Sequence, residues 1–355
     1  MGAGGAEKLI VDMAPIMVEK GYLVEVVIFS SYKDVFSHLL KENNITVTFI
    51  SNSSHYWNIF GVYKLYNILK NKDIIYTHVV HAQYFIALLS VFLPKNIQLI
   101  TIEHSTHNRR RNKKIFRLLE RFIYSRYDKI ISITKQVEKN LLNHLQLNKN
   151  SKFTVIENGI NLDIIRIAKP IERKDLGLDE SDIVIIMIGR FTKAKDQDTL
   201  IRAISVLNKN YKVIFVGEGE LLNNSIELAQ SLNLLDRVQF LGFRKDIPSL
   251  LKMSDIGVLS SHWEGQPLSV IEIMASGIAF VGSKVPGIIE LAEDYGVLFR
   301  EQDAEDCAEK ISNLIKNKKY YDLIVQKCIK RSQEYSINIT VEKYLNLFES
   351  SKENV

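Results

Sequence analysis

Two glutamates lie eight positions apart in the stretch SSHWEGQPLSVIEIMASG, residues 260–277. Glu264 stands in a turn marked by Gly and Pro, and Glu272 stands among the helix-compatible residues that follow. Pro267 favours the first turn of a helix. The unpaired amides of that turn would form a site for a phosphate. The two carboxylates are suited to accept hydrogen bonds from hydroxyl groups on either side of it.

A phosphate site between two hydroxyl-binding acids fits a nucleotide-sugar, in which a diphosphate joins a sugar to a ribose. We therefore expect the loop and helix start to contact such a donor through Gly265, Gln266, Pro267, Leu268 and Ser269. The spacing alone also permits a simpler interpretation. In that alternative Glu264 is an ordinary loop acid and Glu272 an ordinary residue on a helix surface.

Two cations follow another apolar run. Arg190 and Lys195 lie five positions apart, directly after residues 183–189. Arg can hold two phosphate oxygens at once, and Lys supplies a compact charge. The pair could neutralise a diphosphate leaving group without a metal. In isolation the same two residues could also be surface cations.

An Asp-x-Asp sequence, Asp196 to Asp198, has a spacing that some metal sites use. It stands at the start of a helical stretch, where helix capping is the simpler explanation. We therefore predict no metal, and no cofactor other than the nucleotide-sugar substrate.

The elements that would position these residues are short β-branched runs separated by helical stretches. Continuous apolar runs of this kind are typical of parallel strands covered on both faces. There are twelve, in two groups of six: 22–30, 46–50, 73–78, 97–103, 129–134 and 153–158, then 183–189, 212–217, 238–242, 256–260, 278–283 and 296–299. They predict an α/β protein with two doubly wound, Rossmann-like domains that face a cleft.

Length and composition fit this organisation. A chain of 355 residues is too long for one ordinary core, and 46% hydrophobic with 25% charged residues is typical of a soluble protein. The longest apolar run, 85–93, has about half the roughly 18 residues that a membrane span needs. The opening residues predict no signal peptide. Two cysteines, Cys307 and Cys328, favour a reducing compartment, so we expect the cytoplasm.

Basic charge is concentrated in the first half. Residues 1–168 hold 22 Lys and Arg against 13 Asp and Glu, with a focus at Arg109–Arg126. A solvated helix face would explain such a run. Attraction to lipid headgroups on the cytoplasmic membrane, or to a phosphorylated acceptor, would also explain it. Nucleic acid is not expected as a partner, because no nucleic-acid-binding module surrounds the run.

The segment EGQPLSVIEIMASGIAFVGSKVPGIIELAED, residues 264–294, resembles the signature of the retaining glycosyltransferases of the GT-B fold, family four. The resemblance extends over essentially the whole chain. It implies that Glu272 binds the ribose hydroxyls and that Glu264 lies near the donor sugar. It places Arg190 and Lys195 at the diphosphate.

Further motifs match the same family. The turn VGEGEL contributes Gly217, and the loop FLGFRKDI contributes Phe243 and Arg244 near the nucleotide base. His104, in TIEHSTHN, matches a family histidine that approaches the donor sugar from the acceptor domain. His78, His81 and His107 also follow strand runs, and a structural role is the alternative for all four histidines. The turn VIENGI (155–160) matches the hinge side.

The family also has a glycine turn near the donor phosphates or acceptor, and Gly4 and Gly5 match it. In the family that turn follows a first strand, and no such strand precedes these glycines here. We therefore expect two unpaired sheet edges and an exposed strip of core. Either the chain begins after its natural start, or another segment occupies the position.

The resemblance predicts an acceptor-binding domain over residues 1–168 and a nucleotide-sugar-binding domain over 169–333. Residues 334–355 would form a helix that packs back on the first domain, with Tyr335 near the crossover. The expected activity is metal-independent transfer of a hexose or N-acetylhexosamine, from a UDP-linked donor, to a lipid-linked or growing saccharide in surface polysaccharide synthesis (lipopolysaccharide or capsule). A sugar-nucleotide epimerase and a non-catalytic nucleotide-sugar binding protein are the alternatives.

Overall fold

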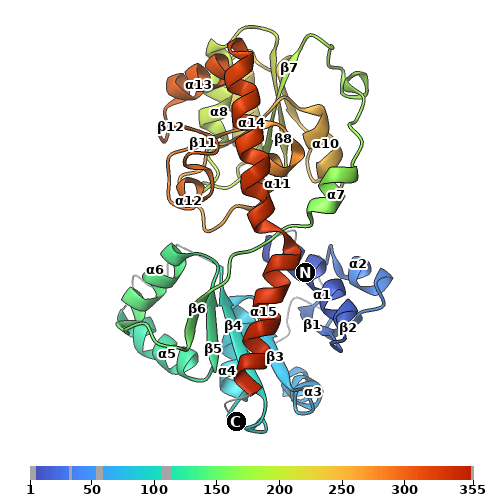
Figure 1. Cartoon of the computed structure of the whole chain (residues 1–355), viewed down its shortest axis with the longest axis vertical. Helices are drawn as coiled ribbons and strands as arrows, with labels where there is room; N and C mark the ends of the chain where they lie inside the picture. Colours follow the sequence, from blue (N-terminus) through green and yellow to red (C-terminus); the bar gives the residue numbers. More distant parts are fainter. Residues whose placement is uncertain (1–4, 32–33, 53–58, 105–113, 353–355) are drawn as a thin grey trace. The chain divides into compact units, whose positions relative to one another are not determined.

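The computed structural model describes residues 5–31, 34–52, 59–104 and 114–352. The chain divides into two compact units (Figure 1). Unit 1 comprises residues 1–159 and 337–355, and unit 2 comprises residues 160–336. The sequence-based boundaries at 168 and 333 therefore lie inside unit 2. The first differs because Ile165, in α7 (Leu162–Ile167), is buried in the core of unit 2.

Unit 2 is built on one six-stranded parallel sheet in the order β12-β11-β10-β7-β8-β9. Its strands are β7 (Ile183–Ile188), β8 (Tyr211–Val216), β9 (Val238–Phe240), β10 (Ile256–Leu259), β11 (Ala279–Ser283) and β12 (Val297–Phe299). Its α-helices, besides α7, are α8 (Gln197–Val206), α9 (Leu222–Ser231), α10 (Ile247–Met253), α11 (Leu268–Ser276), α12 (Ile288–Ala292), α13 (Ala304–Lys316) and α14 (Lys318–Ser332). Two short 3-10 helices complete it, η2 (Arg173–Leu176) and η3 (Gln333–Tyr335).

The centre of this sheet is apolar on both faces. β7 has the sequence IVIIMI, and four consecutive residues of it, 184–187, are buried. Consecutive side chains of a strand point to opposite faces, so burial without alternation means that helices cover both sides. All six predicted runs of this half are strands in the structure, and the doubly wound prediction for unit 2 is confirmed.

Unit 1 has the same alternation of strands and helices, but its strands form two sheets. β1 (Glu25–Ser30) pairs with β2 (Thr46–Ser51), and β3 (Ile74–Thr77), β4 (Gln98–Glu103), β5 (Lys129–Ser132) and β6 (Phe153–Val155) form a second parallel sheet in that order. The helices of unit 1 are α1 (Gly5–Glu19), α2 (Ser37–Glu42), α3 (Ile59–Leu69), α4 (Val80–Leu89), α5 (Lys114–Ser125), α6 (Lys135–Leu145) and α15 (Ile337–Lys352). β1 and β3 each have one strand partner within the described residues, as expected for a sheet that lacks a first strand.

The last helix completes the core of unit 1. Ile337, Val341 and Tyr344 of α15 are buried in one cluster with Leu9 and Met13 of α1. The strands β4 and β5 contribute to the same cluster. Unit 1 is thus assembled from two segments that are separated in sequence by unit 2.

The two chain segments that connect the units are held together. Ile160 pairs with Ser336 in a parallel bridge, and the Ile160 amide donates to the Tyr335 carbonyl at 2.9 Å. On the unit 1 side, the Thr340 hydroxyl donates to the Glu157 carbonyl at 3.0 Å. The predicted hinge turn at 155–160 thus lies beside the start of α15.

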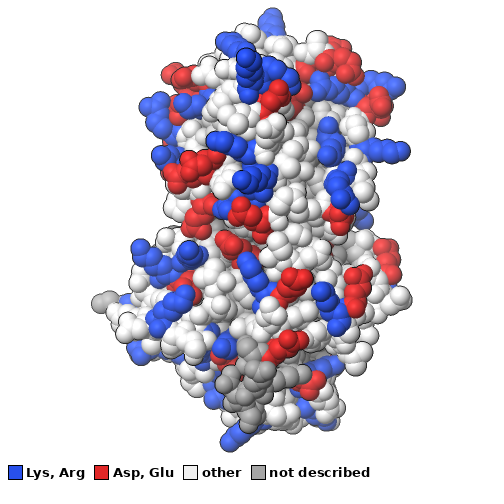
Figure 2. Space-filling model, in the orientation of Figure 1, with Lys and Arg blue, Asp and Glu red and all other residues white. Residues whose placement is uncertain are grey.

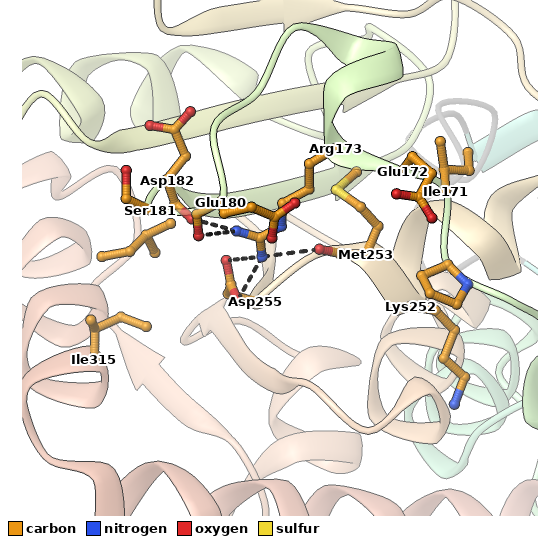
Figure 3. Close-up of a pocket in the computed structure, with 12 residues that line it drawn as sticks. Ile171, Glu172, Arg173, Glu180, Ser181, Asp182, Lys252, Met253, Asp255 and Ile315 are labelled. Carbon is orange, nitrogen blue, oxygen red and sulfur yellow. Dashed lines mark hydrogen bonds and ion pairs between the residues drawn. The ribbon is translucent and has the colours of Figure 1, made fainter.

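Arg173 fastens the amino-terminal edge of the unit 2 sheet, next to a cavity of about 550 Å³ (Figure 3). Its guanidinium bonds both carboxylate oxygens of Asp255, at 3.1 and 3.0 Å, and donates to the Asp182 carbonyl at 2.7 Å. It also donates to the carbonyls of Glu180 and Met253. Both terminal nitrogens of the guanidinium donate to the protein, so we assign Arg173 a structural role.

The surface carries both signs of charge. On the face shown in Figure 2, Lys and Arg side chains are interspersed with Asp and Glu. Over the described residues, no helix combines the length and apolar character needed to cross a membrane.

Replacing Arg173 with Ala should lower the free energy of unfolding by about 2–4 kcal/mol, because it leaves Asp255 and several carbonyls without their donor. Urea denaturation measures the loss. Lys252→Ala is the matched control, since Lys252 lines the same cavity and forms no ion pair with any described residue. Equal stability of the two variants would contradict the structural role of Arg173.

Candidate active site

The carboxyl-terminal edge of the unit 2 sheet brings together most of the residues that the sequence singled out. β7 pairs with β10 on one side and with β8 on the other, and β8 pairs with β9. Because parallel strands end at the same edge, the loops that follow these four strands are neighbours. The loop after β7 carries Arg190 and Lys195, and the loop after β10 carries Glu264. The loop after β8 carries Gly217, and the loop after β9 carries Phe243 and Arg244.

Main-chain hydrogen bonds tie the four loops to one another. The His262 amide donates to the Ala194 carbonyl at 2.8 Å, joining the loops after β10 and β7. The Phe191 amide donates to the Glu218 carbonyl at 3.0 Å, joining the loops after β7 and β8. The Gly217 amide donates to the carbonyl of Gly242, next to Phe243, at 2.8 Å, joining the loops after β8 and β9. The predicted residues therefore lie on one continuous edge.

An ion pair connects two of these loops directly. Lys195 Nζ donates to Glu264 Oε1 at 2.6 Å, and the Ser261 hydroxyl donates to the same oxygen at 2.6 Å. The two charged side chains are only 18% and 12% exposed. An ammonium has three donors, so the bond to Glu264 leaves Lys195 able to bind further oxygens. The interpretation of these residues as an isolated surface cation and loop acid is wrong.

The close approach of Lys195 depends on glycine. A Cβ atom on Gly189 would lie 3.2 Å from Cδ and Cε of Lys195, which run along it. Gly217 has φ +141°, and a Cβ there would lie 2.2 Å from the Gly189 carbonyl oxygen. Only glycine fits at position 217, so the turn after β8 can pack tightly against the start of the Arg190–Lys195 loop.

Arg190 is placed differently from Lys195. Its side chain is exposed, and its guanidinium has no hydrogen-bond or ion-pair partner within the part of the chain that the structure describes. Its carbonyl accepts a hydrogen bond from Gln197 Nε2 at 3.1 Å, which anchors the backbone. An anchored backbone with an uncommitted guanidinium suits Arg190 to an anionic ligand.

The helix α11 begins one residue later than predicted. Pro267 occupies the N-cap position, with φ −73° and ψ 107°, and no side chain caps the helix. The first-turn amides of Leu268 and Ser269 therefore remain suited to an anion, as the sequence indicated. Glu272 is only 6% exposed, so it is no ordinary residue on a helix surface. Gln266 in the preceding loop is also buried.

Gly287, in the loop after β11, packs against the loop that carries Glu264. It has φ +84°, and a Cβ atom there would lie 2.8 Å from the carbonyl oxygens of both Glu264 and Gly265. The Ser283 hydroxyl donates to the Ser261 carbonyl at 2.5 Å. Neither Ser261 nor Ser283 stands in a recognisable spacing, so their contacts could not be predicted from the sequence.

Phe243 and Arg244 lie in the loop after β9. The Phe243 ring is exposed, and so can stack on a flat ligand. Arg244 forms a two-point ion pair with Asp246, in which Nε donates to Oδ1 at 2.7 Å. Its charge is thus partly compensated within the loop.

Asp196 occupies the N-cap position of α8, but its side chain does not cap the helix backbone. Its carboxylate instead accepts a hydrogen bond from the Thr199 hydroxyl at 2.6 Å. Burial raises the pKa of Asp196, and Thr199 and His262 oppose that rise. Asp198 accepts a hydrogen bond from the Ser225 hydroxyl at 3.2 Å. Over the described residues, no group of three or more His, Cys, Asp and Glu is arranged to hold a metal ion.

In unit 1, His104 follows β4 and stacks on His78, which follows β3, with ring centroids 5.7 Å apart. Nε2 of His104 and Nδ1 of His78 are buried and have no hydrogen-bond partner among the described residues. Burial lowers the pKa of His104 to about 4, and burial together with His104 lowers that of His78. Both rings are therefore neutral near pH 7.

The remaining candidates of unit 1 are placed as follows. Gly5 is the first residue of α1 and is exposed, and His81 is an exposed residue of α4. Gly4, His107 and residues 109–113 of the basic run lie outside the described residues.

Comparison with known families matches both halves of the chain. Residues 168–331 match the family described as Glycosyl transferases group 1, and residues 3–164 match the family described as Glycosyltransferase Family 4. The first covers the loops of the unit 2 site, and the second covers His104 and Gly5.

Two curated bacterial proteins are similar in sequence. UDP-Gal:alpha-D-GlcNAc-diphosphoundecaprenol alpha-1,3-galactosyltransferase of Escherichia coli is 27% identical over 260 residues, 68% of this chain and 65% of that protein. N,N'-diacetylbacillosaminyl-diphospho-undecaprenol alpha-1,3-N-acetylgalactosaminyltransferase of Campylobacter jejuni is 32% identical over 216 residues, 58% of this chain and 57% of that protein. The chain thus spans less than two thirds of the length of each.

Among solved structures, Anabaena Alr3699/HepE in complex with UDP and glucose superposes with a TM-score of 0.86 at 22% identity. The match covers 98% of this chain and 96% of that one. This similarity confirms the predicted GT-B fold with two Rossmann-like domains.

The depressed pKa of His104 predicts a pH-dependent stability. The unfolded chain takes up a proton near pH 6.5 that folded His104 resists until about pH 4, so stability is lost as the pH falls through this window. Replacing His104 with Gln should reduce the loss between pH 6.5 and 4 by about 2–3 kcal/mol, measured by urea denaturation. His38→Gln, at an exposed histidine of α2, is the control. An unchanged pH profile in His104→Gln would contradict the assignment.

Proposed function

Because this chain belongs to the glycosyltransferases of group 1 and family 4, we propose that it transfers a hexose or an N-acetylhexosamine from a UDP-sugar to a lipid-linked or growing saccharide. The names of the Escherichia coli and Campylobacter jejuni relatives describe such transfers to diphosphoundecaprenol-linked sugars. The observation that carries the proposal is the edge of unit 2, where Lys195 is paired with Glu264 and the Arg190 guanidinium is exposed.

We assign donor binding to unit 2. Arg190, Lys195 and the first amides of α11 would bind the diphosphate, where negative charge builds as the bond to the sugar breaks. Glu264, held by Lys195 and Ser261, would accept hydrogen bonds from hydroxyls of the sugar. Glu272 would accept them from the ribose, and the exposed Phe243 ring would stack on the base.

Acceptor binding is assigned to unit 1, and the reaction would retain the anomeric configuration. The acceptor hydroxyl would attack the anomeric carbon from the face that the diphosphate leaves. The bond from that carbon to the phosphate oxygen breaks as the bond to the acceptor oxygen forms, and the acceptor proton passes to the leaving phosphate. Neutral His104, with a buried ring nitrogen that lacks a protein partner, would orient a hydroxyl rather than supply charge. The donor charge is neutralised by side chains in this proposal, so no metal is assigned.

Replacing Lys195 or Arg190 with Ala should lower kcat for sugar transfer by about 10²–10³-fold, because each removes a cation from the leaving group. Arg202→Ala, on the exposed side of α8, is the matched control and should keep full activity. Thermal-shift screening with UDP-, GDP- and ADP-sugars first identifies the donor, since a bound donor raises the melting temperature.

Product analysis separates the alternatives. Transferred sugar that appears on an acceptor supports the proposal. An isomerised nucleotide-sugar without any acceptor would indicate an epimerase, and donor binding without turnover would indicate a binding protein. Full transfer by both Arg190→Ala and Lys195→Ala would rule out the assigned leaving-group site.

We further propose that unit 1 binds the membrane that presents a lipid-linked acceptor. α4 and α5 are adjacent, since the Tyr84 hydroxyl donates to Glu120 at 2.8 Å. These two helices and the turn after α4 expose large apolar side chains: Leu88, Val91, Phe92, Leu118, Leu119 and Phe122. Arg121 is exposed on α5, within the basic run 109–126. Exposed apolar residues beside basic ones are typical of helices that lie in a membrane surface.

The double variant Leu118→Glu, Phe122→Glu should release the protein from vesicles that contain phosphatidylglycerol, because it removes buried apolar area and adds like charge. Vesicle co-sedimentation measures binding, and donor hydrolysis in solution should be unchanged. Leu235→Glu, at an exposed leucine of unit 2, is the control. Vesicle binding that survives in the double variant would show that α5 is not the membrane contact.

A further inference from the structure

His262 stands two positions before Glu264 and is the only histidine between residues 160 and 336. Its side chain is 15% exposed and lies between two carboxylates that reach it from different loops. Nδ1 lies 3.0 Å from Glu301 Oε1, and Nε2 lies 3.8 Å from Asp196 Oδ2. The ring therefore links the loop after β10 with the loop after β12 and with the start of α8.

The contact with Glu301 determines how the ring is held. A carboxylate accepts hydrogen bonds and cannot donate them, so Nδ1 carries the proton and donates to Glu301. Glu301 is exposed and stands two residues after β12. It fixes the ring from the solvent side, and Nε2 is then directed at the carboxylate of Asp196.

Asp196 directly follows Lys195, and the chain segments 194–196 and 260–262 are held together at three points. The amide of His262 donates to the Ala194 carbonyl at 2.8 Å, and the buried Ser260 hydroxyl donates to the Asp196 carbonyl at 2.6 Å. The third point is the His262 ring beside the Asp196 carboxylate. Lys195 lies within the first segment, so these contacts determine where its side chain starts relative to the loop after β10.

The backbone at Asp196 needs such support. Asp196 has φ +48°, which is uncommon for a residue with a side chain. This turn separates Lys195 from α8, which begins at the next residue, Gln197. Conformations of this kind persist where the surrounding structure holds them. Burial raises the pKa of Asp196, and Thr199 and His262 oppose that rise, so His262 favours the charged carboxylate that it faces.

We propose that His262 is a positioning residue for sugar transfer. Held by Glu301, its ring fixes Asp196 and thereby keeps Lys195 beside Glu264 while charge builds on the leaving diphosphate. This inference rests on the proposed function, which assigns Lys195 to the leaving group. His262 acts through the Lys195–Glu264 pair and not on the nucleotide. Its loss should therefore lower kcat and leave the KM for the donor nearly unchanged.

Replacing His262 with Ala should lower kcat for sugar transfer by about tenfold, because a small displacement of a group that acts in the transition state is costly. The KM for the donor should change by less than about twofold. His262→Asn should recover kcat to within about threefold of the original value, because Nδ2 of asparagine takes the place of Nδ1 and can donate to Glu301. Calorimetric titration with the donor counts the competent sites, so partial unfolding is not read as a lower kcat.

Glu301→Ala keeps the test valid if His262→Ala folds poorly, because Glu301 is exposed. It should lower kcat by about threefold or more, since it removes the acceptor that holds the ring. Glu305→Ala, at an exposed acid of α13, is the matched control and should keep full activity.

A double variant tests whether His262 acts through Lys195. His262→Ala combined with Lys195→Ala should have the same kcat as Lys195→Ala alone, because the residue to be positioned is then absent. Losses that multiply in the double variant would overturn the proposal. So would a full kcat in His262→Ala while Lys195→Ala is impaired, or a failure of His262→Asn to recover activity. An unimpaired Lys195→Ala would instead overturn the leaving-group assignment of the proposed function, and this inference with it.

Discussion

The structure of unit 2 depends on the position of β7 between β8 and β10. This parallel pairing makes β7 the central strand and brings loops that are far apart in sequence to one edge. The Lys195–Glu264 contact joins residues 69 positions apart. The packing tolerance is small, because a Cβ on Gly217 would overlap the Gly189 carbonyl. The chemistry of the edge is thus set by main-chain geometry before any side chain is considered.

Within this arrangement, the ion pair of Lys195 with Glu264 determines how charge is balanced between the loops after β7 and β10. A carboxylate with little solvent exposure is costly unless a cation or donors compensate it. Lys195 and Ser261 provide this compensation, since both donate hydrogen bonds to Glu264 Oε1. Arg190 keeps a guanidinium without a described partner. The two cations are therefore not equivalent, since one is bound within the site and the other is available to a ligand.

The strands and the edge that their loops share could be predicted from sequence, because parallel strands covered on both faces are continuous apolar runs. All twelve runs are strands, and the residues after β7, β8, β9 and β10 share one edge as topology requires. The side-chain partners could not be predicted. Nothing in the spacing reveals that Ser261 bonds Glu264, or that Glu272 is buried, because both depend on packing between elements. The predicted domain boundary at residue 168 differs from the observed one at 160 for the same reason. The sequence of α7 has no strong sign of burial, but Ile165 packs in the core of unit 2.

Because unit 1 uses segments on both sides of unit 2 in the sequence, its assembly cannot follow the order of synthesis. Leu9 and Met13 share a cluster with Val341 and Tyr344, so α1 meets this packing partner only after the whole of unit 2 has been synthesised. Unit 2, by contrast, is one continuous segment, 160–336, whose contacts are complete before α15 emerges from the ribosome. Domains generally fold as units during synthesis. Unit 2 should therefore reach its native state first. The part of unit 1 that is synthesised before it keeps apolar surface exposed until α15 is available.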